Sequence, residues 1–131
     1  MIYGIGHDVL EISRVSLLLE GRHGERFVER VLTPAERRLA ADKGKRRAEF
    51  IAGRFAAKEA ISKAFGCGIG HTIGFLDMEI VPDNAGRPVA AISRECWARL
   101  GITEPESYNT HITITHQSEL ASAFAVIERK E

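Results

Sequence analysis

The sequence predicts an α+β fold in which a long central helix packs on a short antiparallel sheet within a single domain. The 131 residues match the usual length of one domain, and 44% hydrophobic residues are enough to bury a core. Helical spacing of apolar residues fills the first half of the chain, and alternating strand-like spacing fills much of the second half. Helices followed by strands, without regular alternation of the two, favour the α+β class.

The first predicted elements are a strand and two short helices. Residues 2–9 are predicted to form a short strand that contains Gly4 and Gly6, which indicate a bend or the close approach of another backbone. Ser13 is a candidate N-cap for a helix that ends near Glu20. After two glycines, residues 27–32 resume a helical spacing of apolar side chains.

The clearest local signal is the segment Thr33-Pro34-Ala35-Glu36. It combines a capping hydroxyl, a proline at the first helical position and a glutamate that can reach back to the cap. We therefore predict that a helix begins here, runs to about Lys43 and is ended by Gly44.

Residues 47–65 give the strongest helix prediction. Their apolar side chains recur every three or four positions, and several alanines raise the helix propensity further. Gly66 is expected to end this helix. The residues that carry the pattern are Phe50, Ile51, Ala57, Ile61, Ala64 and Phe65.

The second half of the chain is predicted to be mainly strands. Residues 76–81 alternate apolar and acidic side chains, and a turn at 82–86 leads to a returning strand at 88–92. Ser93 is expected to cap a short helix that ends by Gly101. Two further strands are predicted at 109–116 and 121–128.

Composition excludes several classes of protein. The two cysteines, Cys67 and Cys96, lack the spacing of a zinc site or a disulfide framework. The N-terminus has no basic segment typical of a secretory signal, and no run of 18 apolar residues occurs. We expect a cytoplasmic protein that neither crosses nor binds a membrane.

The net charge of zero hides a segregation of charge along the chain. Residues 14–47 carry ten Lys and Arg against five Asp and Glu, hence +5. The remaining segments carry −2 (1–13), +1 (48–63) and −4 (64–131), so the total is zero. The basic segment could contact a phosphate, a nucleic acid or an acidic protein. Ordinary solvated helix faces would have the same composition.

Glu59 and Lys63 are four residues apart, so both lie on one face of the predicted long helix. Most such pairs only stabilise a helix surface, by a few tenths of a kcal/mol. Here the glycine-rich segment 66–70 follows directly, and a loop of this kind can bring backbone N–H groups and a lysine to a phosphate. The order of residues is not that of a Walker motif.

Two further residues are candidates for the same chemistry. Asp8 ends the predicted first strand and could share a hard cation such as Mg²⁺ with Glu59, although a carboxylate at a strand end often only caps a turn or helix. His116 ends the predicted strand at 109–116 and could contact a phosphate or relay a proton, or be structural. His111 has the opposite parity on that strand, so the two histidines are not expected to share a metal.

Three separated stretches together resemble a known family. They are Ile5-Gly6-His7-Asp8-Val9 with Arg14, the helix from Arg54 to Gly66 (RFAAKEAISKAFG), and His111-Ile112-Thr113-Ile114-Thr115-His116. This combination resembles the holo-[acyl-carrier-protein] synthases, the small trimeric branch of the 4'-phosphopantetheinyl transferases. The resemblance extends over nearly the whole chain and includes residues 27–36 and 77–80.

The resemblance implies transfer of the 4'-phosphopantetheine group of coenzyme A to a serine of apo acyl carrier protein, with Mg²⁺ required. Adenosine 3',5'-bisphosphate would leave, and the product would serve fatty acid biosynthesis. Asp8 and Glu59 would be the metal ligands, and Lys63 would contact the phosphates and could protonate the leaving group. Glu59, directly or through a metal-bound water, would remove the serine proton. His116 matches a histidine associated with coenzyme A and activity.

The resemblance also implies where ligands and partners bind. The glycine-rich turn near coenzyme A falls on Gly66, Cys67 and Gly68. Cys67 departs from the small or hydroxyl residue common at that position, which weakens any hydrogen bond expected there. The molecule would be a homotrimer with each site at a subunit boundary. Since such carrier proteins are acidic, we predict that the basic segment docks them through Arg14, Arg22 and Arg26.

Two other classes of function are compatible with parts of the sequence. A noncatalytic adaptor could use the basic helices to bind an acidic protein or nucleic acid, but such a surface has no use for Glu59 between two lysines. A magnesium-dependent phosphohydrolase would share the carboxylates but would release phosphate without a protein acceptor.

Overall fold

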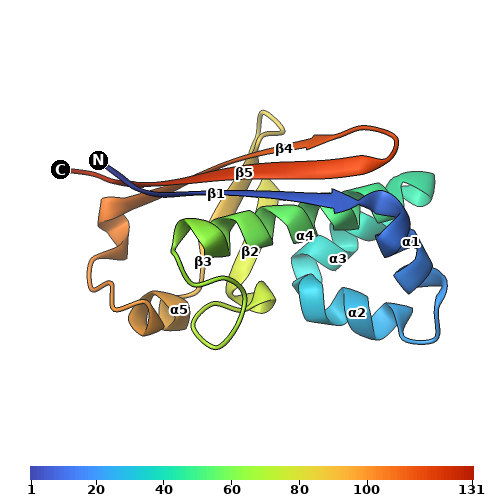
Figure 1. Ribbon diagram of the computed structural model, residues 1–131, viewed down its shortest axis with the longest axis horizontal. Helices are drawn as coiled ribbons and strands as arrows, with labels where there is room; N and C mark the ends of the chain where they lie inside the picture. The colour runs from blue at the N-terminus through green and yellow to red at the C-terminus, as the bar shows by residue number, and fades with distance from the viewer.

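The structure, a computed structural model that describes residues 1–131, confirms the α+β class. Three antiparallel strands form the main sheet in the order β1 (Ile2–Glu11), β5 (Leu120–Arg129) and β4 (Tyr108–His116). The long helix α4 (Arg47–Ala64) lies along one face of this sheet (Figure 1). The strongest predicted helix is therefore the one that supports the sheet.

Small residues let α4 and the sheet approach closely. A Cβ atom at Gly4 would collide with the carbonyl oxygen of Ala64, and one at Gly6 with that of Ala60. Alanines at positions 121, 123 and 125 of β5 are buried on the same side of the sheet. The expected close backbone approach at the two glycines is confirmed.

Three short helices precede α4: α1 (Ile12–Glu20), α2 (Gly24–Val31) and α3 (Pro34–Ala41). Both hydrogen bonds of the predicted capping box are present, since Glu36 N donates to Thr33 and Thr33 N donates to Glu36. The prediction of Ser13 as an N-cap is wrong. The first strand continues through Glu11, and the N–H of Ile12 donates to the carbonyl of Glu119 instead (2.8 Å).

The predicted single sheet is divided in two. Strands β2 (Met78–Pro82) and β3 (Pro88–Ile92) form a separate hairpin, followed by α5 (Arg94–Arg99), which Ser93 caps as predicted. Short 3₁₀ segments connect the larger elements. They are η1 (Gly44–Arg46), η2 (Phe75–Asp77) and η3 (Pro105–Ser107).

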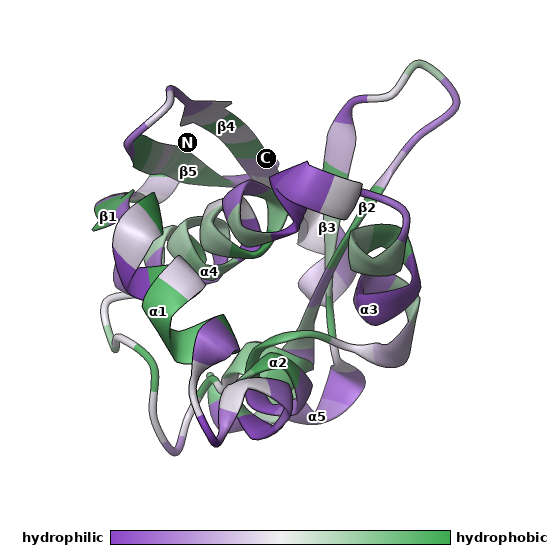
Figure 2. Cartoon of the chain, turned by 90° about the vertical axis from the view of Figure 1, so that its right-hand side faces the viewer, coloured by the Kyte–Doolittle hydropathy of each residue, from purple (hydrophilic) through white to green (hydrophobic).

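The core has two clusters, one along the C-terminal part of α4 and one along its N-terminal part. The larger one joins α4 to β5, β2 and the buried side chain of Ile73, and the smaller one joins α4 to the helices α1 to α3. Figure 2 shows that α1 and α3 alternate hydrophobic and hydrophilic segments, as expected of helices with one buried face. The central helix thus holds both halves of the molecule together.

Membrane insertion by a helix finds no support here, because none of the helices combines the length and hydropathy needed to span a bilayer.

Candidate active site

Two of the predicted site residues meet at the edge of the sheet. The Lys63 ammonium on α4 lies 3.1 Å from the Asp8 carboxylate oxygen Oδ1 and donates to the carbonyl of His7 at the same distance. Asp8 does not end its strand, because β1 continues to Glu11 through its pairing with β5. The alternative that Asp8 only caps a turn or helix is therefore wrong.

Glu59 faces the same group of charges. Partial burial raises the pKa of the Glu59 carboxyl, the negative charge of Asp8 raises it further, and Lys63 opposes both effects. The position four residues before Lys63 places the two side chains on one helix face. The structure thus brings together Asp8, Glu59 and Lys63 from two segments far apart in the sequence.

The chemistry of this group suits a hard cation. The chain places no group of three or more His, Cys, Asp or Glu side chains in a position to hold a metal ion. Mg²⁺, however, commonly binds through one or two carboxylates and completes its coordination with water and substrate phosphates. Two carboxylates that repel each other, as at Asp8 and Glu59, fit that donor set.

The glycine-rich turn ends α4 beside Lys63. Gly66 and Gly68 have φ values of +84° and +67°, a conformation that favours glycine. The N–H groups of Cys67 and Gly68 both donate to the carbonyl of Ser62 (3.2 Å each), so they close the end of the helix. The N–H groups of Gly66, Cys67 and Gly68 are thus bonded within the chain, so at these three positions the turn offers a ligand close approach to the backbone and no free N–H donor.

His116 lies in another part of the molecule, away from Asp8, Glu59 and Lys63. Its ring nitrogen Nδ1 is 3.1 Å from the Glu49 carboxylate, near the start of α4. The ring also lies beside Gly53, which is six residues or ~9 Å along the helix from Glu59. His116 and Asp8 moreover lie on the two opposite edge strands of the main sheet, β4 and β1. A single copy of the chain therefore does not join His116 to the Asp8–Glu59–Lys63 group.

His116 instead lines a shallow cavity of about 270 Å³ at the outer edge of β4. Lys43 and Arg54 contribute positive charge to it, and the Arg54 guanidinium lies 4.3 Å from the ring centre of Phe50. Neither Lys43 nor Arg54 was predicted as a site residue from the sequence. The four-residue spacing of Phe50 and Arg54 on the predicted helix could have indicated Arg54. The other lining residues are Leu39, Pro82, Gly86, Pro88 and Ile114.

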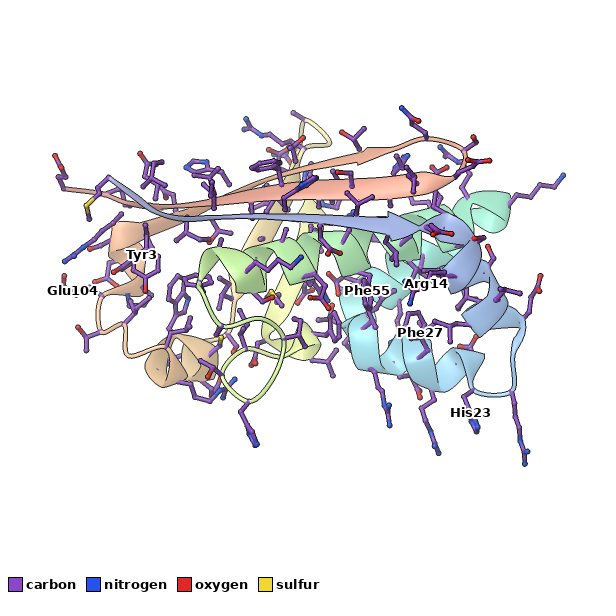
Figure 3. The ribbon with its side chains drawn as sticks, viewed as in Figure 1. Tyr3, Arg14, His23, Phe27, Phe55 and Glu104 are labelled. Atoms are coloured by element: carbon purple, nitrogen blue, oxygen red, sulfur yellow. The ribbon has the colours of Figure 1, made fainter.

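The predicted docking arginines, Arg14, Arg22 and Arg26, are all exposed on α1, α2 and the turn between them. Figure 3 shows Arg14 in the same half of the molecule as Phe27 and Phe55, whose rings are 6.2 Å apart, and Tyr3 and Glu104 at the opposite end. This half of the molecule therefore presents positive charge beside partly buried aromatic rings.

Comparison with known proteins identifies the family. The model of the 4'-phosphopantetheinyl transferase superfamily matches residues 4–125. A holo-[acyl-carrier-protein] synthase of Bacillus cytotoxicus is 46% identical over 129 residues, which are 98% of this chain and 97% of that protein.

Solved structures of the same family are similar to this chain in both sequence and fold. A Bacillus anthracis holo-(acyl-carrier-protein) synthase in complex with CoA (3',5'-ADP) is 41% identical with a TM-score of 0.82, and the match covers 99% of each chain. The Helicobacter pylori enzyme in complex with coenzyme A is 34% identical with a TM-score of 0.81, over 95% of this chain and 99% of that one. The chain belongs to the holo-[acyl-carrier-protein] synthase family of the 4'-phosphopantetheinyl transferase superfamily.

Proposed function

We propose that the protein transfers the 4'-phosphopantetheine group of coenzyme A to a serine hydroxyl of apo acyl carrier protein and releases adenosine 3',5'-bisphosphate. The observation that carries this proposal is the convergence of Asp8, Glu59 and Lys63 beside a glycine turn. The relatives named above, two of them solved with coenzyme A or its nucleotide part, support the same substrate.

Asp8 and Glu59 would hold Mg²⁺ between them. Burial and then repulsion from Asp8 raise the pKa of Glu59, and a divalent cation would relieve the repulsion. When bound, Mg²⁺ would neutralise diphosphate oxygens and stabilise the negative charge that develops on the leaving phosphate.

The chain's own residues would move the protons. Glu59 would accept the proton of the attacking serine, directly or through a water molecule. Lys63 has a side chain that is 49% exposed, so its ammonium can leave Asp8 to contact the diphosphate and protonate the departing oxygen. The turn formed by Gly66, Cys67 and Gly68 would let the phosphopantetheine arm approach the backbone closely.

A second copy of the chain would complete each site. His116 and the basic cavity lie at the β4 edge of the sheet, whereas Asp8 lies at the β1 edge, so a neighbouring copy would supply them to the coenzyme A bound at Asp8 and Lys63. The outer face of the sheet carries exposed apolar side chains suited to such contact, including Ile5 (62% exposed) and Phe124 (44%). We propose a homotrimer with its sites at the subunit boundaries.

The acidic carrier protein would dock on the basic segment through Arg14, Arg22 and Arg26. Neither a nucleic acid nor a membrane is part of this proposal. A cytoplasmic setting would suit the two cysteines, which are unpaired.

The test is incubation of the protein with coenzyme A, Mg²⁺ and apo carrier protein, followed by intact mass measurement. We expect the carrier protein to gain one phosphopantetheine group, and no gain when coenzyme A is left out or the metal is chelated. Release of phosphate without a modified carrier would instead identify a phosphohydrolase. An unmodified carrier, with binding to acidic proteins alone, would identify an adaptor.

A further inference from the structure

A fully buried ion pair adjoins the proposed active site, and no step of the reaction uses it. The Lys58 ammonium donates to the Glu36 carboxylate and to the carbonyl of Val31, both at 2.6 Å. Both charged side chains are 0% exposed. Burial of charge is unfavourable unless every group is paired, and even a paired buried charge adds little to stability. The presence of this ion pair therefore indicates a role other than stabilising the fold.

The same carboxylate organises the surrounding backbone. It also accepts from the N–H of Thr33 (2.8 Å) and from that of Ile80 on β2 (2.7 Å). The carbonyl of Ile80 in turn accepts from Arg54 on α4 (3.1 Å). Side chains of α3 and α4 thus satisfy the free edge of β2, and no buried side-chain polar atom lacks a partner.

On the opposite side of α4, most contacts with β1 are between small residues, and the directional bonds there are the two formed by Lys63 itself. There the helix contacts β1 through the glycines at 4 and 6 and through its own Ala60 and Ala64. Contacts between small residues allow close approach but involve no interdigitating side chains, and dispersion between them is not directional. The bonds of Lys58 are directional, and they act one residue away from Glu59.

We propose that Glu36 and Lys58 are positioning residues for the transfer reaction. They would hold α4 at the rotation and axial position that direct Glu59 and Lys63 toward Asp8. Through the carbonyl of Val31, the last residue of α2, the pair also ties the proposed carrier-docking helices to the active-site helix. The inference rests on the proposed function.

The test is the double variant Glu36→Gln/Lys58→Met, which removes both charges together and leaves neither buried alone. We expect kcat to fall about tenfold to a hundredfold, because a displacement of about 1 Å can have an effect of that size. The KM for coenzyme A should stay within about twofold, since the pair touches no ligand. Ile127→Val, a core truncation in β5, is the matched control that lowers the melting temperature and leaves kcat unchanged.

Wild-type kcat in the folded double variant would overturn the inference. If the double variant does not fold, Glu36→Asp and Lys58→Arg keep both charges while displacing them, and wild-type kcat in both would overturn it equally. Failure of the wild-type protein to modify a carrier would reject the proposed function instead. In that case a crystal structure of a folded variant still decides: Lys63 should no longer lie within about 4 Å of Asp8, and an unchanged contact would refute the positioning role.

Discussion

At the scale of single residues, the proposed active site places one ammonium group, bonded to Asp8, near a second carboxylate, Glu59. Lys63 lies 3.1 Å from Asp8, while Asp8 raises the pKa of Glu59. The Asp8 side chain is only 18% exposed and is held in the sheet, whereas Lys63 is 49% exposed. The carboxylate is therefore the fixed partner, and the lysine is the group free to follow a phosphate.

Glu59→Gln tests the proposed base directly. The amide keeps the size of the side chain but cannot accept the serine proton, so we expect kcat to fall by about a hundredfold to ten-thousandfold. Steady-state kinetics with coenzyme A and apo carrier protein measure it. Glu95→Gln, on the exposed side of α5, is the control with unchanged kcat. Full turnover by a Glu59→Gln variant that binds Mg²⁺ and coenzyme A normally would eliminate Glu59 as the base.

The carboxylate of Asp77 contributes to the stability of the fold. Asp77 accepts from Arg99 (2.6 Å), from the Ser93 hydroxyl (2.8 Å) and from the N–H of Gly74 (2.8 Å). Burial alone would raise the pKa of Asp77, but these three bonds outweigh it and hold the pKa below the ordinary value of 3.8. The carboxylate therefore joins the end of the glycine-rich loop to α5.

The effect of Asp77 should depend on pH. Since the pKa of Asp77 is lower in the folded state, the charged form stabilises the fold above pH 3.8, and this contribution is lost as the pH falls through the folded pKa. Asp77→Asn should lower the free energy of unfolding at pH 7, and the difference from wild type should shrink below pH 3.8. Urea denaturation at several pH values measures it. A difference that stays constant from pH 7 to pH 3 would contradict the assignment.

At the scale of elements, the features predicted correctly from the sequence are those that neighbouring residues in the chain determine. The capping box at Thr33 and Glu36 and the apolar spacing of α4 depend on neighbours in the chain, and both are confirmed. The start of α1 depends on a long-range hydrogen bond between Ile12 and Glu119, so the prediction of Ser13 as its N-cap was wrong.

The burial of Lys58 was not predicted, because lysine side chains are usually exposed. Its spacing could have indicated burial, since it lies three residues from Ile61 and seven from Ile51, both of which are buried.

The candidate site was predictable to the same extent. The spacing of Glu59 and Lys63 placed both on one helix face, but no spacing could show that Asp8 joins them, because β1 reaches α4 only through tertiary packing. For His116, the sequence predicted a place in the site that one copy of the chain does not provide. The structure separates it from the other site residues within one chain, so its predicted role now depends on a second copy.

The end of α4 should depend on the backbone conformation of Gly66. At φ = +84° an alanine is strained, so we expect Gly66→Ala to lower the free energy of unfolding by about 1–2 kcal/mol. Gly70→Ala is the matched control in the same loop, because Gly70 has no positive φ and a Cβ atom there would meet nothing within 4 Å. Urea denaturation compares the two, and equal effects would show that conformation at Gly66 is unimportant.

The exposed arginine of α1 should act on carrier binding alone. For Arg14→Glu we expect the KM for apo carrier protein to rise about tenfold at low salt and less at high salt, since charge attraction is screened. The value of kcat should not change. Arg38→Glu on α3 changes the same charge within the same basic segment and should have a smaller effect. If Arg14→Glu leaves the KM at low salt unchanged, the docking surface is assigned to the wrong helix.

At the scale of the whole molecule, the proposed site residues form two groups at opposite edges of the main sheet. The edge of the sheet at β1 carries Asp8 beside Lys63, and the edge at β4 carries His116 beside the basic cavity. The sheet face turned away from α4 exposes Ile5, Val9 and Phe124 between these edges. Contact between copies through that face would bury the apolar side chains and could bring the β4 edge of one copy to the β1 edge of the next.

Subunit mixing tests whether two copies share each site. Asp8→Asn and His116→Ala should each be inactive as pure assemblies. Co-expressed in equal amounts, they should recover up to about a quarter of wild-type activity, because about one boundary in four would join an intact Asp8 to an intact His116. Light scattering would establish the size of the mixed assembly. A mixture as inactive as its parents, in assemblies shown to contain both variants, would contradict the sharing of each site between two copies.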